Sequence, residues 1–333
     1  MNWLRLKTVL AASVLAFAVA GCEVPPQDFT QTGYRGLGIE DNNNRQTVFD
    51  SVQALAARIP QTPPQIPKME PAPAGTYQNV QVLGHLSAVE FNLFMQSLVE
   101  WVAKDEGCAY CHVQTADSVN YASDANYTKI VSRRMIQMTQ DINTNWAAHV
   151  GEEKGVNCWT CHQSNPVPTN YWFYTDENQP LRNYLDREGA RVQGPYIFSG
   201  PGQRNRQSIN QTVYTYQLMT HMSNALGVNC TFCHNTARFA DWDESSPKRV
   251  TALRGLRMVR HLNTEYLVPL QAEWPDYRLG PMGDGPKLQC STCHQGANLP
   301  QYGTTATRGT GWPGITQIGY PNPSAEAETT DGG

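Results

Sequence analysis

The sequence predicts a mainly α-helical protein with long loops, built from four helix-containing units in two pseudo-related halves. Three observations support this fold class. Segments with apolar residues at helical spacing recur four times between residues 91 and 270. Each segment ends shortly before a Cys-x-x-Cys-His motif. The chain also contains 22 Pro and 26 Gly, which favours long loops and ordered turns.

The N-terminus has the features of a bacterial lipoprotein export signal. A basic stretch with Arg5 and Lys7 precedes an apolar run from Val9 to Ala20, which leads into a Val-Ala-Gly-Cys sequence that resembles a lipobox. The run is too short to span a bilayer comfortably. We expect residues 1–21 to be a signal peptide and Cys22 to carry lipid on the periplasmic side of the inner membrane. The alternative is an uncleaved anchor with a spare thiol.

Two segments flank the predicted body. Residues 22–76 hold few periodic hydrophobic residues and include a Pro-rich stretch from Pro60 to Pro73. We therefore expect an N-terminal anchor followed by an extended polyproline arm. Residues 301–333 are rich in Gly, Thr, Pro and Ala with an acidic end, which predicts a flexible C-terminal tail.

The body, residues 77–300, consists of four units, each with a predicted helix ahead of one motif. The apolar spacing predicts helices over 91–103, 127–149, 213–226 and 249–270. The units cover approximately residues 77–125, 126–170, 205–245 and 246–300. The motifs are Cys108-Ala-Tyr-Cys111-His112, Cys158-Trp-Thr-Cys161-His162, Cys230-Thr-Phe-Cys233-His234 and Cys290-Ser-Thr-Cys293-His294.

These motifs contain eight of the nine Cys and four of the eight His. Cys-x-x-Cys-His is the attachment signature of c-type haem, in which two thiols add to the vinyl groups and the His binds the iron. Zinc knuckles would give no reason for a His after every second Cys. A redox dithiol needs only one such pair, and disulfides between such close Cys would stabilise almost nothing. The sequence therefore predicts four covalently bound haems.

An internal similarity relates the second and fourth units. Residues 134–144 align with residues 254–264 and share an Arg at the start, a central Met and a closing Asn-Thr pair. The first and third units then form the other pair. This pattern predicts two halves with two haems each.

Each motif His fills one axial position of its iron, which leaves four positions to assign. A Met opposite the His raises the reduction potential, whereas a second His lowers it. For the first haem we favour Met95, which lies in the middle of a predicted helix 17 residues before His112. Met69, in the Pro-rich segment, is the weaker candidate.

For the third haem we favour Met219, which lies 15 residues before His234. Because a helix rises about 1.5 Å per residue, this reach is similar to that of the first unit. Met222 and His221 are alternatives one helix face away. We expect His85 and His221 to be structural, hydrogen-bonded residues.

The alignment assigns the ligands of the other two haems. Met135 aligns with Gly255, so we expect Met135 to bind the second iron and the fourth unit to take its ligand from elsewhere. His149 is the favoured residue for that position, and His261 is the alternative. The expected set is three His/Met haems and one His/His haem.

All four irons would then be six-coordinate and closed to substrates. A multihaem reductase needs at least one open iron position, so we expect an electron carrier and not an enzyme. The formal charge of −4 and the pI near 6.1 argue against a nucleic-acid partner.

Several flanking strings resemble a known family. With the ligand order Met95, Met135, His149 and Met219, the sequence is similar to the tetrahaem cytochrome subunit of purple-bacterial photosynthetic reaction centres over roughly residues 77–300. The strings are Val82-Leu83-Gly84, Glu106-Gly107-Cys108, Arg133-Arg134-Met135, Asn143-Thr144-Asn145-Trp146, Asn229-Cys230-Thr231-Phe232-Cys233-His234-Asn235 and Arg257-Met258-Val259-Arg260.

The resemblance implies a function and partners. Such a subunit sits on the L and M subunits, and it re-reduces the photo-oxidised bacteriochlorophyll special pair with electrons from a small soluble cytochrome c or a high-potential iron–sulfur protein. It implies that the haem of Cys108 is outermost, that of Cys230 is nearest the special pair, and the His149 haem is an inner step of lower potential. A reductase and a light-independent electron conduit are the competing functions.

The resemblance also points to one residue that would tune a potential. Arg249 matches a family Arg beside the haem nearest the special pair, where a cation would favour the reduced iron. The alternative is an ordinary Arg in the first turn of a helix.

Overall fold

The computed structural model describes residues 27–31, 40–60, 69–151, 155–177, 179–186, 209–303 and 313–316. Within these ranges the protein is mainly α-helical, and its strands form three separate two-stranded antiparallel sheets. The predicted fold class, mainly α with long loops, is confirmed. The expected signal peptide, Cys22 and most of the Pro-rich stretch and tail lie outside the described residues.

The four predicted helices are present. They are α3 (Ala88–Val102), α4 (Tyr127–Asn145), α8 (Ile209–Leu226) and α9 (Lys248–Leu262). The second is extended by α5 (Ala147–Val150), and the fourth by the π-helical turn η4 (Asn263–Leu267) and the 3-10 helix η5 (Val268–Glu273). The α-helical ladder cannot continue through η5 because Pro269 has no amide hydrogen to donate.

The remaining elements are short. The motif segments form η2 (Gly107–Tyr110), α6 (Cys158–His162), η3 (Cys230–Phe232) and α10 (Cys290–His294). The other helices are α2 (Arg45–Ala56), α7 (Gln179–Leu185), η6 (Asp276–Arg278), η7 (Pro300–Gly303) and α11 (Pro313–Thr316). The strand pairs are β1 (Gln27–Gln31) with β2 (Glu40–Asn44), β3 (Val113–Gln114) with β4 (Val119–Asn120), and β5 (Tyr171–Trp172) with β6 (Lys287–Leu288).

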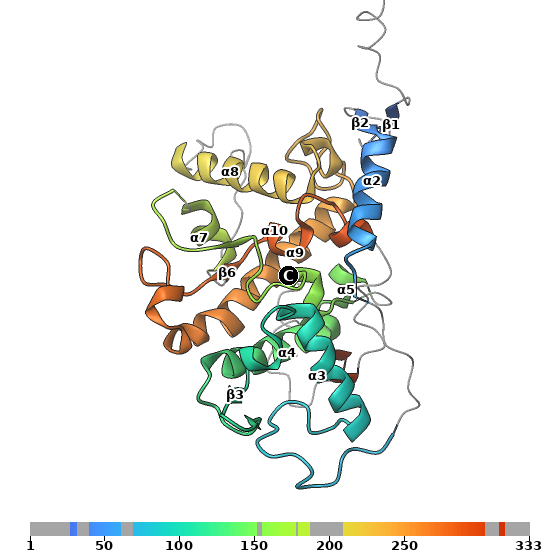
Figure 1. Ribbon diagram of the computed structural model, residues 1–333. Helices are drawn as coiled ribbons and strands as arrows, with labels where there is room; N and C mark the ends of the chain where they lie inside the picture. The colour runs from blue at the N-terminus through green and yellow to red at the C-terminus, as the bar shows by residue number, and fades with distance from the viewer. Residues whose placement is uncertain are drawn as a thin grey trace, which may run out of the picture.

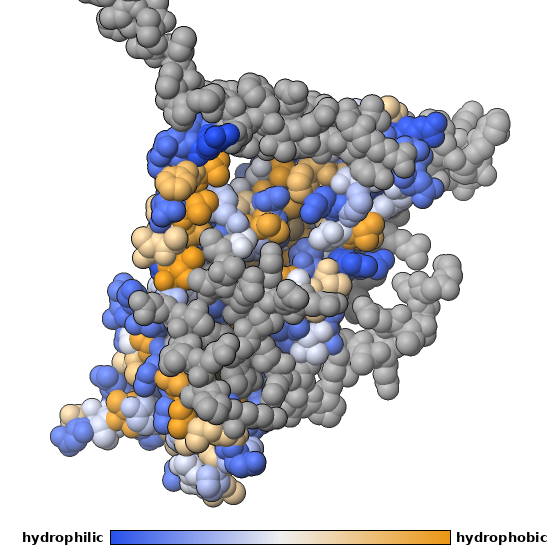
Figure 2. All heavy atoms as spheres, turned by 90° about the vertical axis from the view of Figure 1, so that its right-hand side faces the viewer, coloured by the Kyte–Doolittle hydropathy of each residue, from blue (hydrophilic) through white to orange (hydrophobic). Residues whose placement is uncertain are grey.

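The four units are stacked along one axis of the molecule, in an order that differs from chain order (Figure 1). The third unit, with α8, lies at one end, and the first, with α3 and β3, lies at the other. The fourth and second units lie between them, because α8 packs on α10, α10 on α6, and α6 on α3. The spatial order of the units is therefore one, two, four, three. From the side, apolar side chains surround a recess in the upper half of the molecule (Figure 2).

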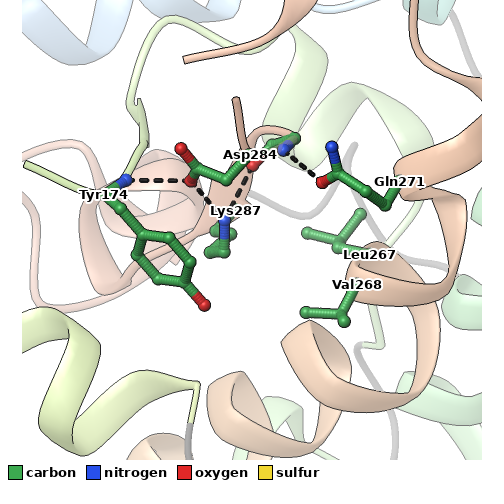
Figure 3. A pocket seen from close by; sticks show the side chains of 7 residues that line it. Tyr174, Leu267, Val268, Gln271, Asp284 and Lys287 are labelled. Carbon is green, nitrogen blue, oxygen red and sulfur yellow. Dashed lines mark hydrogen bonds and ion pairs between the residues drawn. The ribbon is translucent and has the colours of Figure 1, made fainter. Parts of the chain in front are cut away.

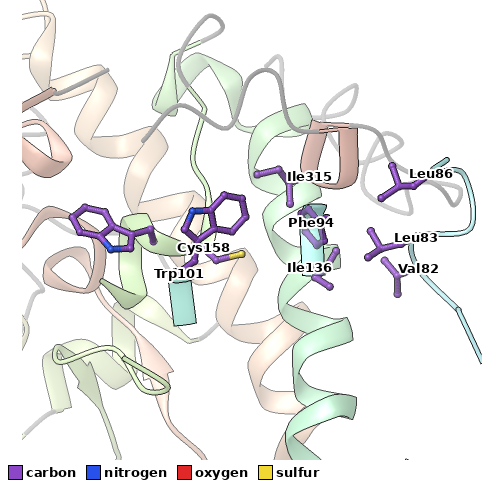
Figure 4. Packing of buried hydrophobic residues seen from close by; sticks show 9 residues of the cluster. Val82, Leu83, Leu86, Phe94, Trp101, Ile136, Cys158 and Ile315 are labelled. Atoms are coloured by element: carbon purple, nitrogen blue, oxygen red, sulfur yellow. The ribbon is translucent and has the colours of Figure 1, made fainter. Parts of the chain in front are cut away.

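One apolar cluster joins the first two units (Figure 4). Phe94 and Trp101 of α3 meet edge to face at 6.0 Å between ring centroids and pack with Ile136 of α4 and with Cys158. The helix α3 begins where Ser87 forms a reciprocal capping box with a Glu three residues later. The cap fixes where α3 starts and so which of its residues face α4.

The N-terminal segment contains more structure than we expected. Ahead of the expected Pro-rich arm, residues 40–56 form β2 and the helix α2. The Asn44 side chain accepts hydrogen bonds from two backbone amides at the start of α2, at 2.9 and 3.2 Å. No residue of α2 is buried, which explains the weak hydrophobic periodicity of this segment.

Part of the predicted tail is also ordered. The short helix α11 packs against α3 and α4, and Ile315 is fully buried. Gln140 Nε2 donates to the Gly314 carbonyl at 2.8 Å, and Asn143 Nδ2 donates to the Ile315 carbonyl at 3.0 Å. The expectation of a flexible tail is therefore wrong for residues 313–316, while 304–312 and 317–333 lie outside the described residues.

Candidate haem-binding sites

The second and fourth motifs are built alike. In each, a polar residue caps a single α-helical turn, and a Thr at the third position of the turn bonds back to the capping residue. Gln163 and Gln295 follow the two motifs in the left-handed conformation, with φ of 49° and 50°, which ends each turn sharply. Both thiols and the His of each motif are thus held on one turn of helix.

An Asn clamp leads into each of these two motifs. Asn143 accepts from the Val156 amide at 2.7 Å and donates to the Val156 carbonyl at 2.9 Å. Asn263 makes the same pair of bonds to Leu288, at 2.8 and 2.9 Å. Val156 and Leu288 each lie two residues before the first Cys of their motif. The main helix of each of these units, α4 or α9 with its extension η4, therefore holds the backbone that enters its own haem motif.

The first and third motifs form a second matched pair. Both start as 3-10 turns, η2 and η3. In each, the second Cys and the His donate backbone hydrogen bonds to the carbonyl of the first Cys, at 3.3 and 3.0 Å in both motifs. These shared geometries support the predicted pairing of units one with three and two with four.

The motif histidines are oriented for metal binding. His162, His234 and His294 each donate from Nδ1 to a backbone carbonyl three to five residues later, at 2.9, 2.9 and 3.0 Å. This leaves Nε2 free to face an iron. His112 instead packs edge-on against the Tyr121 ring at 5.0 Å. Burial lowers the pKa of all four, so each is the neutral imidazole that metals require.

His149 lies opposite His294. The two ring centroids are 6.3 Å apart, and His149 donates from Nδ1 to the Thr251 carbonyl at 3.1 Å. A metal–imidazole bond is about 2 Å, so two imidazoles on opposite sides of one iron have ring centres about 6 Å apart. Both rings therefore have the separation and the tautomer that one shared iron requires, and the residues of the fourth site fit a haem.

The alternative ligand His261 is engaged elsewhere. Its Nε2 is 2.9 Å from Oδ2 of the buried Asp141, and its ring packs against Trp146 at 5.6 Å. The geometry favours His149 over His261 as the ligand of the fourth iron.

The three methionines lie on the helices of their own units. Met95 on α3, Met135 on α4 and Met219 on α8 are each partly buried against an apolar cluster. Met69, the alternative for the first site, is 46% exposed, which favours Met95. Met219 and Met222 border the same cluster, so burial does not separate them.

Two of the motif thiols are not activated as thiolates. Burial raises the pKa of Cys158 and of Cys290 to about 12, whereas reactive or zinc-binding cysteines have a lowered pKa. Cys161 and Cys293 bring the second and fourth motifs together, with 2.7 Å between their Sγ atoms. Across the described ranges, no three His, Cys, Asp or Glu side chains form a metal site by themselves.

Two cations lie next to the motifs. Arg249, in the first turn of α9, donates to the Asp241 carbonyl at 2.8 Å and to Ser245 Oγ at 2.7 Å. Burial raises the pKa of the nearby Cys233 thiol, and the positive charge of Arg249 offsets part of this rise. Beside the fourth motif, the buried Lys287 ammonium lies 2.5 Å from Asp284 Oδ2, at the edge of a small pocket (Figure 3).

The chain is similar to known proteins over most of its length. The family described as photosynthetic reaction centre cytochrome C subunit matches residues 23–184 and 176–316. The chain belongs to this family. Photosynthetic reaction centre cytochrome c subunits from Rubrivivax gelatinosus, Thermochromatium tepidum and Roseobacter denitrificans are 41%, 39% and 37% identical to it. The alignments cover 97%, 92% and 94% of this chain and 92%, 79% and 92% of these relatives.

Family membership confirms the coarse functional expectation. The cytochrome subunit is an electron carrier of photosynthesis and not an enzyme, and it carries covalently bound c-type haem. It associates with the reaction centre and therefore with a membrane. No helix within the described ranges is long and apolar enough to cross a membrane.

Proposed function

We propose that the chain carries electrons from a soluble periplasmic donor to the photo-oxidised special pair, and that it uses four covalent haems for this. The donor would be a small cytochrome c or a high-potential iron–sulfur protein, and the acceptor complex would contain the L and M subunits. The observation that carries the proposal is the single row of motifs, one, two, four, three, in which each packs on the next. Bound haem would supply the one-electron iron couple.

The proposed axial ligands close every iron. Met95, Met135 and Met219 would each oppose the motif His of their own unit, and His149 would oppose His294 across the fourth site. The 6.3 Å separation of the His149 and His294 rings supports the His/His pair. A chain with four closed irons can pass electrons but offers no position for a reductase substrate.

The N-terminus suggests how the row is oriented. If Cys22 carries lipid, it lies five residues before Gln27, and five extended residues span at most about 17 Å. The β1–β2 hairpin, which begins at Gln27, lies at the same end of the molecule as α8 (Figure 1). The third unit would then face the membrane and the special pair, and the first unit would face the periplasm and the soluble donor.

Arg249 supports the same orientation. Helix N-termini disfavour positive charge, yet α9 begins with Lys248 and Arg249 and has no acidic residue in its first turn. A stabilising effect on the helix therefore does not account for Arg249. Its position beside Cys233 does, since a cation there would raise the potential of the third haem. The last carrier before the special pair would thus be a high-potential one.

Flash-induced absorbance changes in membranes test this function. We expect the c-type α-band to bleach within microseconds of a flash, and the bleaching to disappear when this chain is deleted. Intact chain with full haem content but no light-driven oxidation would reject the photosynthetic role and favour a light-independent conduit. Cyanide or carbon monoxide binding to the native protein would favour a reductase.

A further inference from the structure

Gly255 lies in α9 at the point where the His149 side chain reaches from the second unit to the fourth. A Cβ atom at Gly255 would lie 2.4 Å from Cε1 and 2.9 Å from Nε2 of His149. Such short contacts do not occur between non-bonded atoms. The Thr251 carbonyl, one turn earlier on the same helix, accepts the His149 Nδ1 hydrogen at 3.1 Å. The imidazole therefore rests on bare backbone at Gly255 and is hydrogen-bonded at Thr251.

Backbone conformation does not explain this glycine. Gly255 is buried inside a regular α-helix and is absent from the positive-φ glycines of the described residues. Glycine destabilises a helix interior relative to alanine because it loses more conformational freedom on folding. The structural reason for a glycine at this position is therefore the space that the His149 ring occupies.

The matching position of α4, the aligned helix of the second unit, holds Met135. We propose that the residue at this helix position selects the distal ligand of its site. On α4 a methionine would supply the ligand from within the unit, whereas on α9 the missing side chain admits His149 from the neighbouring unit. Gly255 is thus a positioning residue that makes the fourth haem His/His and keeps its potential below that of a His/Met haem. This inference rests on the proposed ligand set.

The test is spectroscopy of the purified holoprotein. Near-infrared magnetic circular dichroism separates His/His from His/Met haems, and a redox titration gives the four potentials. We expect Gly255→Ala to lose the His/His signal of one haem and to change one of the four potentials, with the other three unchanged. Gly84→Ala is the matched control, because nothing lies within 4 Å of a Cβ atom there.

A stability cycle keeps the test informative if Gly255→Ala folds poorly. Alanine is the better helix former, so Gly255→Ala should raise the melting temperature where the ring is absent, in a His149→Ala background. With His149 present, the same substitution should lower it. Equal effects in the two backgrounds would overturn the role assigned to Gly255.

The outcomes separate the two hypotheses. A wild-type protein without a His/His haem would overturn the ligand set and this inference together. A wild-type His/His signal that persists unchanged in Gly255→Ala would overturn only the inference.

Discussion

At the scale of single residues, two cations beside neighbouring sites differ in how their charge is balanced. Lys287 is buried and lies 2.5 Å from the Asp284 carboxylate, so the pair is neutral as a unit. The hydrogen bonds of Arg249 go to neutral acceptors, and its guanidinium lies 3.9 Å from the Trp242 ring centroid. A neutral pair has a short-ranged field, whereas a cation held by neutral groups acts over a longer distance. The two residues should therefore affect their haems unequally.

Replacing Arg249 tests this difference. We expect Arg249→Gln to lower the midpoint potential of one haem by on the order of 50 mV, since a tenfold change in a one-electron equilibrium corresponds to about 59 mV. The measurement is a redox titration of all four haems. Arg257→Gln, on the exposed face of the same helix, is the control and should leave all four potentials unchanged. If both variants have the wild-type potentials, Arg249 does not tune a haem.

At the scale of elements, the Asn clamps connect α4 and the α9–η4 segment to the motifs that follow them. Asn143 and Asn263 occupy matching positions, and each satisfies both backbone groups of a residue just ahead of its motif. Asn263 is fully buried and also donates to the Leu185 carbonyl at 2.8 Å. The clamp fixes the distance between the helix and the first Cys of each motif.

Removing a clamp should lower the stability of the protein and have little effect on the haem ligands. We expect Asn263→Ala to lower the free energy of unfolding by about 2–4 kcal/mol, because the buried and half-buried backbone groups that this fully buried side chain bonds lose their partner. Asn143→Ala should lower it less, because Asn143 is only half-buried. Chemical denaturation of the holoprotein measures this loss. Asn298→Ala, at an exposed position, is the control, and a loss as small as that of the control would mean that the clamps are dispensable.

The helix α11 makes a second prediction at this scale. Ile315→Asp would place a carboxylate in a fully buried apolar site, so we expect α11 to detach. Limited proteolysis should then release the C-terminal segment more than about tenfold faster, because cleavage follows the population of the open form. Val89→Asp, at a 41% exposed position on α3, should leave the rate unchanged; equal rates in both variants would show that α11 does not hold the segment.

Sequence reasoning identified the elements whose signal is local. The motifs follow from the reactivity of paired Cys beside His, and α3, α4, α8 and α9 follow from apolar residues at helical spacing. The choice of His149 followed from the internal alignment, in which Gly255 stands where the second unit has Met135. The helix α2 was missed because it has no buried face, and α11 was missed because four residues show no periodicity. The clamps were missed because a side chain that bonds distant backbone leaves no spacing in the sequence, although the aligned Asn143 and Asn263 were a signal.

At the scale of the whole molecule, counterpart residues of the second and fourth units touch each other. Cys161 lies next to Cys293, Gln163 Nε2 donates to Gln295 Oε1 at 2.6 Å, and Asp141 pairs with its aligned counterpart His261. Contacts between equivalent positions are what a two-fold axis produces. They support the predicted organisation in two halves, with the axis between the two inner sites.

The membrane attachment can be tested on the whole chain. We expect Cys22→Ser to move the subunit from the membrane to the soluble periplasmic fraction in a strain that lacks the L and M subunits, because two lipid chains would hold it firmly. Intact mass should show a lipidated Cys22 in the wild type. A wild-type chain that retains Met1 or carries an unmodified Cys22 would reject the lipoprotein hypothesis.

The order one, two, four, three also bears on how the molecule is made. A chain that emerges N-terminus first presents its first three motifs before the fourth. The fourth motif, however, fills the place between the second and the third, so these cannot be joined until the last quarter of the body arrives. A chain interrupted before Cys290 would lack the motif that links the second to the third in the row, so it should not be a shorter working carrier.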